Sequence, residues 1–201
     1  RNFLNVVMAA ATLSMASIKA YSAVVSGPIY NPANGHNYYM LSSSTWTVAE
    51  SQAIGLGGHL VTVNDAAENS WLQSTFSLFG GVRRDLWIGL NDLTDKGNYT
   101  WTSGEPVNYV NWTPDNPNDF LNQSVVFLYS GPGPGQPAHI PGWSAGQWDT
   151  YGNSATYDHT GPGIREIVGV VEVPEPSAMA LVMCTALGVI ASKFSGRRSG
   201  L

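Results

Sequence analysis

The run Leu86-Trp87-Ile88-Gly89-Leu90 is the feature that most constrains how this chain can fold. It has the length and apolar character of a buried strand, and a turn-rich segment follows it. A glycine inside such a strand indicates that another backbone or a ring approaches closely. We therefore expect a central strand at 86–90, with Gly89 at its point of closest contact.

Two helices are predicted upstream of this strand. Thr47 and Glu50 fit a capping box, and Gly57-Gly58 would end the first helix. Asp65 and Glu68 cap the second helix in the same way. The first helix should pack on the sheet through one face, made of Trp46, Ala49, Ala53 and Leu56. The second carries Trp71, Leu72 and Phe76.

The remaining strands are short and separated by turns. Tyr30–Leu41 reads as a hairpin whose turn is Asn34-Gly35, and Val125–Tyr129 is a further apolar strand. The glycine- and proline-rich stretch Gly131–Pro137 cannot pair in a ladder, so we expect an exposed insertion. The sequence thus favours a strand- and loop-rich domain carrying helices.

Composition excludes several classes of function. Apolar residues make up 43% and charged residues 11%, which indicates one globular domain of roughly 150 residues between the two ends. The net charge of −5 offers no basic stripe, so nucleic-acid binding is not expected. The four histidines lack paired metal spacing, and the single cysteine, Cys184, lies outside the domain. We therefore expect no enzyme activity.

Several motifs occur in the order of one known family. Trp87-Ile-Gly-Leu is followed by Asn111-Trp112, by Asn116-Pro117-Asn118, by Trp148-Asp149 and by Val170-Val171-Glu172. This order resembles the C-type lectin-like domain, over residues 27–173. The resemblance implies an α+β fold in which two helices pack on small antiparallel sheets beside a long loop region.

The resemblance also implies specific contacts. The last strand, 164–173, would pair with the first. Ala53 and Val171 would take the positions of a disulfide that many members of the family have. The Asn116–Pro117 bond would be cis, and it would aim the Asn116 and Asn118 side-chain oxygens towards Asp149.

In the family, a loop and a neighbouring strand hold one calcium ion, which grips two sugar hydroxyls. The matching metal positions here are Asn116, Asn118, Asp149 and Thr150, and the loop glutamate falls on or near Gln123. Only Asp149 among them carries charge, although Asp115 and Asp119 lie nearby. Because Ca²⁺ affinity falls steeply as ligand charge is removed, we expect Ca²⁺ binding to be weak.

Three functions remain open at this point. The first is calcium-assisted sugar binding. The second is metal-free carbohydrate or exopolysaccharide binding, with ligand contacts from Asn116, Asn118, Gln123, Asp149 and Trp148. The third is a structural or protein-binding surface module that uses the same fold without glycan. Trp112, Trp143 and Trp148 are either stacking platforms or core residues.

The two ends predict export. The apolar run Phe3–Met15 before Ala20-Tyr21-Ser22 fits a signal peptide over residues 1–22. Residues 174–201 begin with Pro-Glu-Pro, continue with an apolar stretch and end in a basic tail. This resembles the PEP-CTERM signal of bacterial surface proteins. It implies a membrane helix with the basic end in the cytoplasm, a sorting enzyme that cuts there, and delivery to the cell envelope, surface or matrix.

Overall fold

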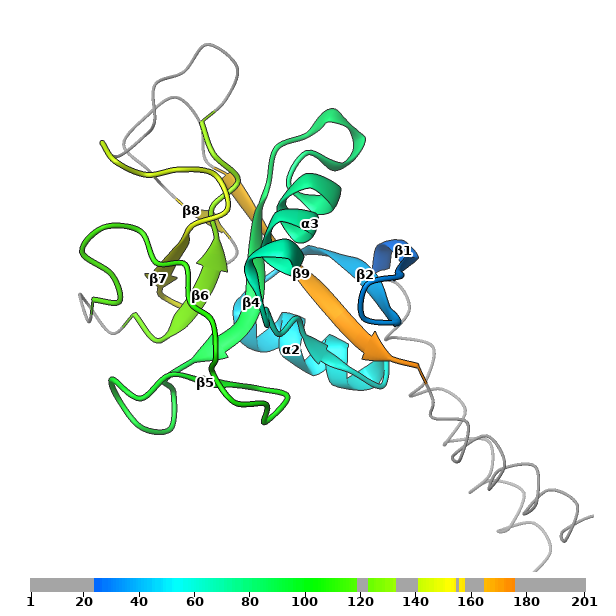
Figure 1. The fold of residues 1–201 in the computed structure, drawn as a ribbon, viewed down its shortest axis with the longest axis horizontal. Helices are drawn as coiled ribbons and strands as arrows, with labels where there is room; N and C mark the ends of the chain where they lie inside the picture. Colours follow the sequence, from blue (N-terminus) through cyan, green and yellow to red (C-terminus); the bar gives the residue numbers. More distant parts are fainter. Residues whose placement is uncertain (1–23, 119–122, 133–140, 155, 158–164, 176–201) are drawn as a thin grey trace, which may run out of the picture.

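The computed structural model describes residues 24–118, 123–132, 141–154, 156–157 and 165–175. One sheet runs through them in the order β1-β2-β9-β4-β6-β7 (Figure 1). The predicted signal peptide, the C-terminal apolar segment and most of the glycine- and proline-rich insertion lie outside these ranges. The strands are β1 (Val24–Asn31), β2 (His36–Ser43), β3 (His59–Leu60), β4 (Asp85–Asn91), β5 (Thr100–Trp101), β6 (Val125–Leu128), β7 (Trp148–Tyr151), β8 (Thr156–Tyr157) and β9 (Arg165–Pro174).

Helix α2 spans Trp46–Gly55 and helix α3 spans Ala66–Phe76, followed by the short 3-10 turn η2 at Phe79–Gly81. Both helices carry side-chain N-caps. Asp65 caps α3 as predicted, whereas α2 is capped by Thr45 instead of Thr47, so the expected capping box with Glu50 is wrong. Among the described residues, no helix has the length and apolar character needed to cross a membrane.

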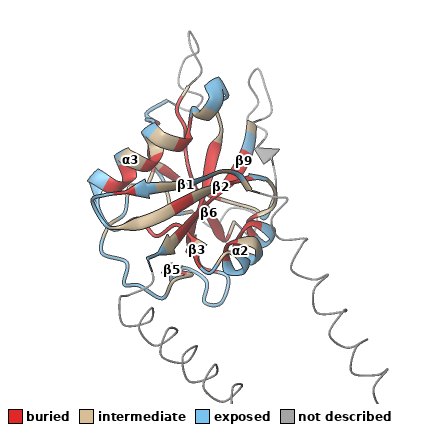
Figure 2. Ribbon diagram, turned by 90° about the vertical axis from the view of Figure 1, so that its right-hand side faces the viewer, coloured by how far each residue is buried: buried red, intermediate tan, exposed pale blue. Residues whose placement is uncertain are grey.

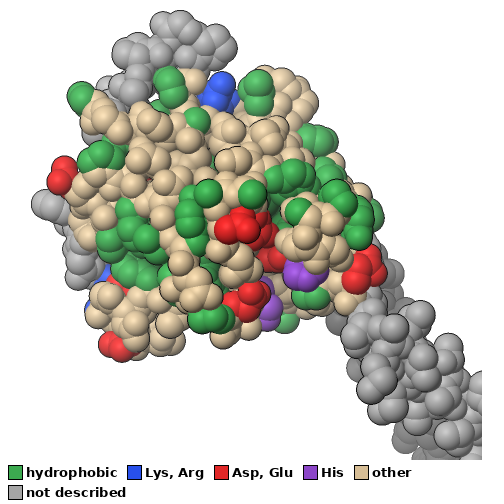
Figure 3. All heavy atoms as spheres, in the orientation of Figure 1, with side chains coloured by type: hydrophobic (Ala, Val, Ile, Leu, Met, Phe, Trp, Pro, Cys, Tyr) green, Lys and Arg blue, Asp and Glu red, His purple; other side chains and the backbone are tan. Residues whose placement is uncertain are grey.

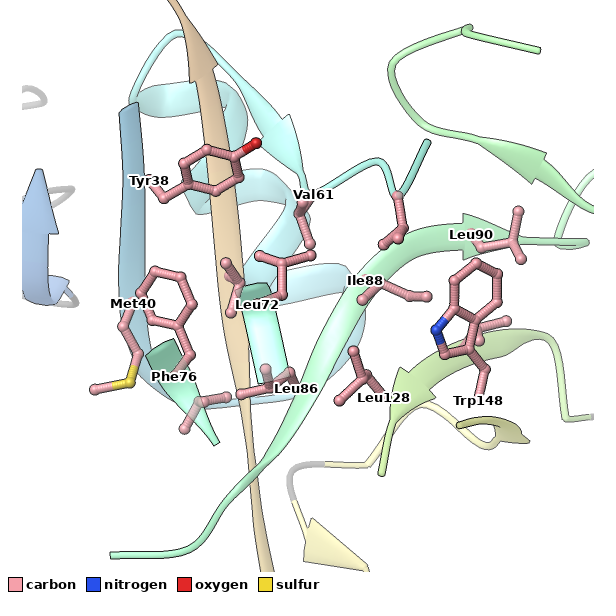
Figure 4. Close-up of a cluster of buried hydrophobic side chains, with 14 of the residues drawn as sticks. Tyr38, Met40, Val61, Leu72, Phe76, Leu86, Ile88, Leu90, Leu128 and Trp148 are labelled. Atoms are coloured by element: carbon pink, nitrogen blue, oxygen red, sulfur yellow. The ribbon is translucent and has the colours of Figure 1, made fainter. Parts of the chain in front are cut away.

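The core lies between the helices and the sheet, where Figure 2 shows the buried residues. One cluster joins Leu86, Ile88 and Leu90 of β4 to Leu128 and Trp148, as seen in Figure 4. The second cluster packs α2 against the sheet. It contains Leu41, Trp46, Ala49, Ala53, Leu60, Trp87, Val125, Phe127, Tyr129, Trp143, Ile167 and Val171. Ala53 and Val171, the predicted substitutes for a disulfide, are thus both buried in the same cluster.

Strand β4 is fully buried, and Gly89 is its point of closest backbone contact, as predicted. A Cβ atom at Gly89 would lie 2.5 Å from the Leu60 carbonyl oxygen and 2.7 Å from Thr102 Oγ1. The Gly89 amide donates to Val61 O at 2.9 Å. The segment around Leu60 therefore lies directly on the central strand, and only glycine allows it to come so close.

The last strand does not pair with the first, which corrects one expectation. β9 pairs antiparallel with β2 and parallel with β4, while β1 pairs only with β2 among the described strands. Because β1 and β2 form a hairpin, β2 has one edge left for β9. The sheet is consequently mixed, with β9 near its centre.

A buried polar network ties the hairpin to α3 and β9. The Tyr38 hydroxyl lies 2.7 Å from Glu68 Oε1 and 2.9 Å from Glu172 Oε1. His36 Nδ1 pairs with Glu172 Oε1 at 2.6 Å. Asn64 N donates to Glu68 Oε2 at 2.9 Å. Burial raises the pKa of Glu68 above its ordinary value.

The two adjacent arginines, Arg83 and Arg84, also have partners. Arg83 Nη1 donates to Ser130 O at 2.5 Å, and Arg84 Nε lies 3.5 Å from Glu166 Oε2. Arg165 Nη1 donates to Gly131 O at 2.6 Å. Arg83 and Arg165 thus fix the segment that leads into the insertion.

Candidate functional site

The polar loop is held against β7 by backbone hydrogen bonds. Thr113 N donates to Trp148 O at 2.8 Å, and Trp148 N donates to Asn111 O at 2.7 Å. These bonds form a bridge between Trp112 and Trp148. The loop that starts at Thr113 therefore begins directly beside β7.

Four oxygen atoms meet where the loop faces this strand. Thr150 Oγ1 lies 3.0 Å from Asn116 Oδ1, 3.0 Å from Asn118 O and 3.2 Å from Gln123 Oε1. We call these four atoms the oxygen cluster. The cluster brings together three of the five predicted ligand-binding residues, Asn116, Asn118 and Gln123. With Thr150 it also holds three of the four predicted metal positions. A single hydroxyl hydrogen serves the three acceptors.

The loop supports the oxygen cluster from within. Asn116 Nδ2 donates to Thr113 Oγ1 at 2.7 Å, and Asn118 Nδ2 donates to Asn116 Oδ1 at 2.8 Å. The Asn116–Pro117 bond is cis, as the resemblance implied. The orientation of the Asn116 side-chain amide is therefore set by its neighbours before any ligand binds.

Asp149 and Trp148, the two further predicted ligand-binding residues, are outside the oxygen cluster. Strand residues alternate between the two faces, so Asp149 lies on the other face of β7 from Thr150, opposite Phe127 of β6. The Asn116 side-chain oxygen and the Asn118 backbone carbonyl meet Thr150, the neighbour of Asp149 on β7. Asp149 is also only 5% exposed.

Trp148 lies in the core next to the site. Its side chain is fully buried, and its indole nitrogen donates to Asn69 Oδ1 at 2.7 Å. A ligand at the surface cannot reach this ring. Trp148 is therefore a core residue, as is Trp143, which is 7% exposed.

Three other rings lie around Trp148 and are only partly buried. Trp112 and Tyr109 make edge contacts with Trp148, with ring centroids 5.8 Å and 5.6 Å away, and Tyr99 contacts Trp112 at 5.3 Å. We call Tyr99, Tyr109 and Trp112 the aromatic ledge. Burial, and secondarily the charge of Asp65, raises the pKa of the Tyr109 hydroxyl. Hence the Tyr109 ring stays neutral, and the ledge offers partly buried ring surface around Trp112, which directly precedes the loop.

Sequence reasoning missed three residues that build the site. Thr113 Oγ1 accepts from the Asn116 side-chain amide. Asn69 connects two segments, because its Oδ1 accepts from the Trp148 indole and its Nδ2 donates to Gly146 O at 2.9 Å. Lys96 Nζ donates to Gln123 O at 3.2 Å. The spacing of Thr113 three residues before Asn116 is a local turn signal that could have been read. Asn69 and Lys96 are far away in the sequence and gave no such signal.

The oxygen cluster fits a calcium ion poorly. All four of its oxygens are neutral, and the Thr150 hydroxyl points a hydrogen into the group, whereas Ca²⁺ requires several oxygens that include carboxylates. Within the described ranges, three or more His, Cys, Asp or Glu side chains are nowhere grouped as metal ligands.

Comparison with known proteins places the chain in a family. The family model described as Lectin C-type domain matches residues 42–154. A type-2 ice-structuring protein of Hemitripterus americanus is 36% identical over 84 residues, which cover 42% of this chain and 48% of that protein. An alpha-N-acetylgalactosamine-specific lectin of Patiria pectinifera is 34% identical over 108 residues, which cover 50% of this chain and 64% of that protein. The chain thus spans about half or somewhat more of these relatives.

Solved structures show the same fold. A calcium-independent type II antifreeze protein superposes with a TM-score of 0.54 at 20% identity, covering 76% of this chain and 96% of that one. The predicted α+β arrangement of two helices on the sheet with a long loop region is confirmed.

Proposed function

Because the chain belongs to the C-type lectin domain family, whose model matches residues 42–154, we propose that it binds carbohydrate beside Asn116 and Asn118 without a metal ion. The observation that carries this proposal is the oxygen cluster next to the aromatic ledge. A lectin is among the relatives, and the family is one of binding modules, which agrees with the expectation of no enzyme activity.

The chemistry of the oxygen cluster suits sugar hydroxyls. A sugar hydroxyl both donates and accepts, and neutral amides and hydroxyls can serve it in either direction. Gln123 Oε1 is the most distant acceptor of Thr150, at 3.2 Å, so it is the one best placed to accept from a ligand hydroxyl. The aromatic ledge can pack against the apolar face of a sugar ring.

Glycan-array screening of the full chain, with Ca²⁺ and with chelator, tests this function. We expect binding that chelator leaves unchanged. Gln123→Met keeps the side-chain length and removes the acceptor, and it should weaken binding about fivefold to tenfold. Gln52→Met on α2, away from the loop, is the matched control and should bind as wild type does.

The second candidate is a surface module that does not bind glycan. The relative named as an ice-structuring protein favours it, as does the exposure of Val107 and Val110 on either side of Tyr109. In that case no glycan on the array should bind, and Gln123→Met should change nothing. Either result would contradict the carbohydrate proposal.

We further propose that the protein is exported and sorted in a bacterial host. The apolar run Phe3–Met15 and the Pro174-Glu175-Pro176 segment with its basic tail support this. The sorting enzyme would cut within residues 174–201, so the apolar segment would be removed from the mature protein. Mass spectrometry of the mature protein should find both ends shortened, and recovery of intact Arg198 would contradict the processing.

A further inference from the structure

Lys96 is the one basic residue beside the oxygen cluster within the described residues. The basic side chains described are Arg83, Arg84, Lys96 and Arg165, and the three arginines lie at the other end of β4, around Ser130. Basic atoms occupy only small parts of the face shown in Figure 3. Lys96 is therefore separated from the other basic residues, in a chain with more acidic than basic residues.

The ammonium group of Lys96 joins two segments. Lys96 Nζ lies 3.7 Å from Asp92 Oδ1 and donates to Gln123 O at 3.2 Å. Asp92 is only 2% exposed, and its other oxygen accepts from Gly97 N at 2.8 Å. A carboxylate so buried requires a compensating cation, so Asp92 holds the Lys96 ammonium near the loop.

Gln123 connects this ion pair to the oxygen cluster. Its backbone carbonyl accepts from Lys96, while its side-chain oxygen accepts from Thr150. The next residue is fixed as well, because Asp92 N donates to Ser124 O at 3.0 Å and Ser124 N donates to Tyr151 O at 3.1 Å. The position of the Gln123 acceptor thus depends on what holds its backbone.

We propose that Lys96 is a positioning residue for the sugar site, in which the Lys96 ammonium, held by Asp92, sets the place of Gln123. This rests on the proposed carbohydrate function only for its effect on affinity. The Lys96 ammonium then serves as a built-in cation at Gln123, where the loop returns to β6. The site consequently needs no added ion to keep its shape.

Two readouts test this role in the full chain. In Lys96→Met, amide hydrogen exchange at 124–126 should become about fivefold to tenfold faster, without ligand, because the anchor of the segment is lost. Affinity for a bound glycan should fall by a similar factor. Lys96→Arg keeps the cation and should retain most of both. Arg84→Met, which breaks the 3.5 Å pair with Glu166, is the matched control and should change neither.

The outcomes separate the two proposals. If wild type binds no glycan, the proposed function fails, and the exchange rates still decide the role of Lys96. Unchanged exchange at 124–126 in Lys96→Met would overturn the positioning role. Weaker glycan binding with unchanged exchange would also overturn it, because Lys96 would then contact the ligand directly.

Discussion

Replacing Thr150 by valine tests whether one hydroxyl closes the loop onto β7. Valine has nearly the same shape, but a methyl group takes the place of the hydroxyl. The Thr150 side chain is fully buried, so the methyl would face Asn116 Oδ1, Asn118 O and Gln123 Oε1 at hydrogen-bond distance. The change therefore removes one donor from three acceptors and leaves packing almost intact.

The expected loss of stability follows from these contacts. One hydroxyl hydrogen makes one hydrogen bond at a time, worth about 1 kcal/mol net, and a fully buried acceptor left without a donor costs about 1–3 kcal/mol. The three acceptors are only part-buried, and Asn116 Oδ1 keeps the Asn118 amide as a donor. We therefore expect Thr150→Val to lower the free energy of unfolding by about 1–2 kcal/mol.

Urea denaturation followed by tryptophan fluorescence measures this loss, and the m-value should stay unchanged. Thr150→Ser is the control, because it keeps the hydroxyl and loses a methyl. Amide exchange at Asn118 should become faster in Thr150→Val and stay as in wild type in Thr150→Ser. A valine variant with wild-type stability and wild-type exchange would refute the reasoning.

Three further substitutions probe other parts of the argument. Thr150→Asp adds a carboxylate to the oxygen cluster, so Ca²⁺ binding should appear in calorimetry where wild type shows little, and its absence would mean that the cluster cannot open around an ion. Gly89→Ala should cost about 1–3 kcal/mol in denaturation, because its Cβ would lie 2.5 Å from Leu60 O; a wild-type midpoint would contradict that close approach. Glu68 has a raised pKa, so its contribution to stability is present below pH 4.5 and is lost as the pH rises through the raised value. Glu68→Gln should lack this loss, and equal pH profiles for both proteins would show that Glu68 is not the source.

Local features of the site could be predicted, and features that depend on strand register could not. The loop 114–118 is marked by its own sequence, so Asn116 and Asn118 were found. Which residue of β7 meets them depends on the pairing of β7 with β6, and a shift of one residue exchanges the two faces. That is why both Asp149 and Thr150 were predicted as site positions but the loop oxygens were expected to face Asp149, whereas Asn116 Oδ1 and Asn118 O meet Thr150.

The predicted cap of α2 was wrong for a related reason. Thr47 has a glutamate three residues later and so fits the capping box, whereas Thr45 has a valine there, so the local pattern favours Thr47. The observed cap follows from Trp46, whose indole nitrogen donates to Ile88 O at 2.8 Å on the central strand. Because this long-range contact fixes the first helical residue, the cap falls on Thr45. Gly89, by contrast, could be interpreted correctly because the signal lies in the strand itself.

The position of β9 near the centre of the sheet also determines how the domain can be displayed. β9 ends at Pro174, paired with His36 of β2, while the loop packs on β7 at the opposite edge of the sheet (Figure 1). A tether joined after Glu175 therefore leaves the domain on the side away from Asn116 and Asn118. Coupled to a surface through this end, the domain would point its loop outward, so many copies could engage one extended polymer at once.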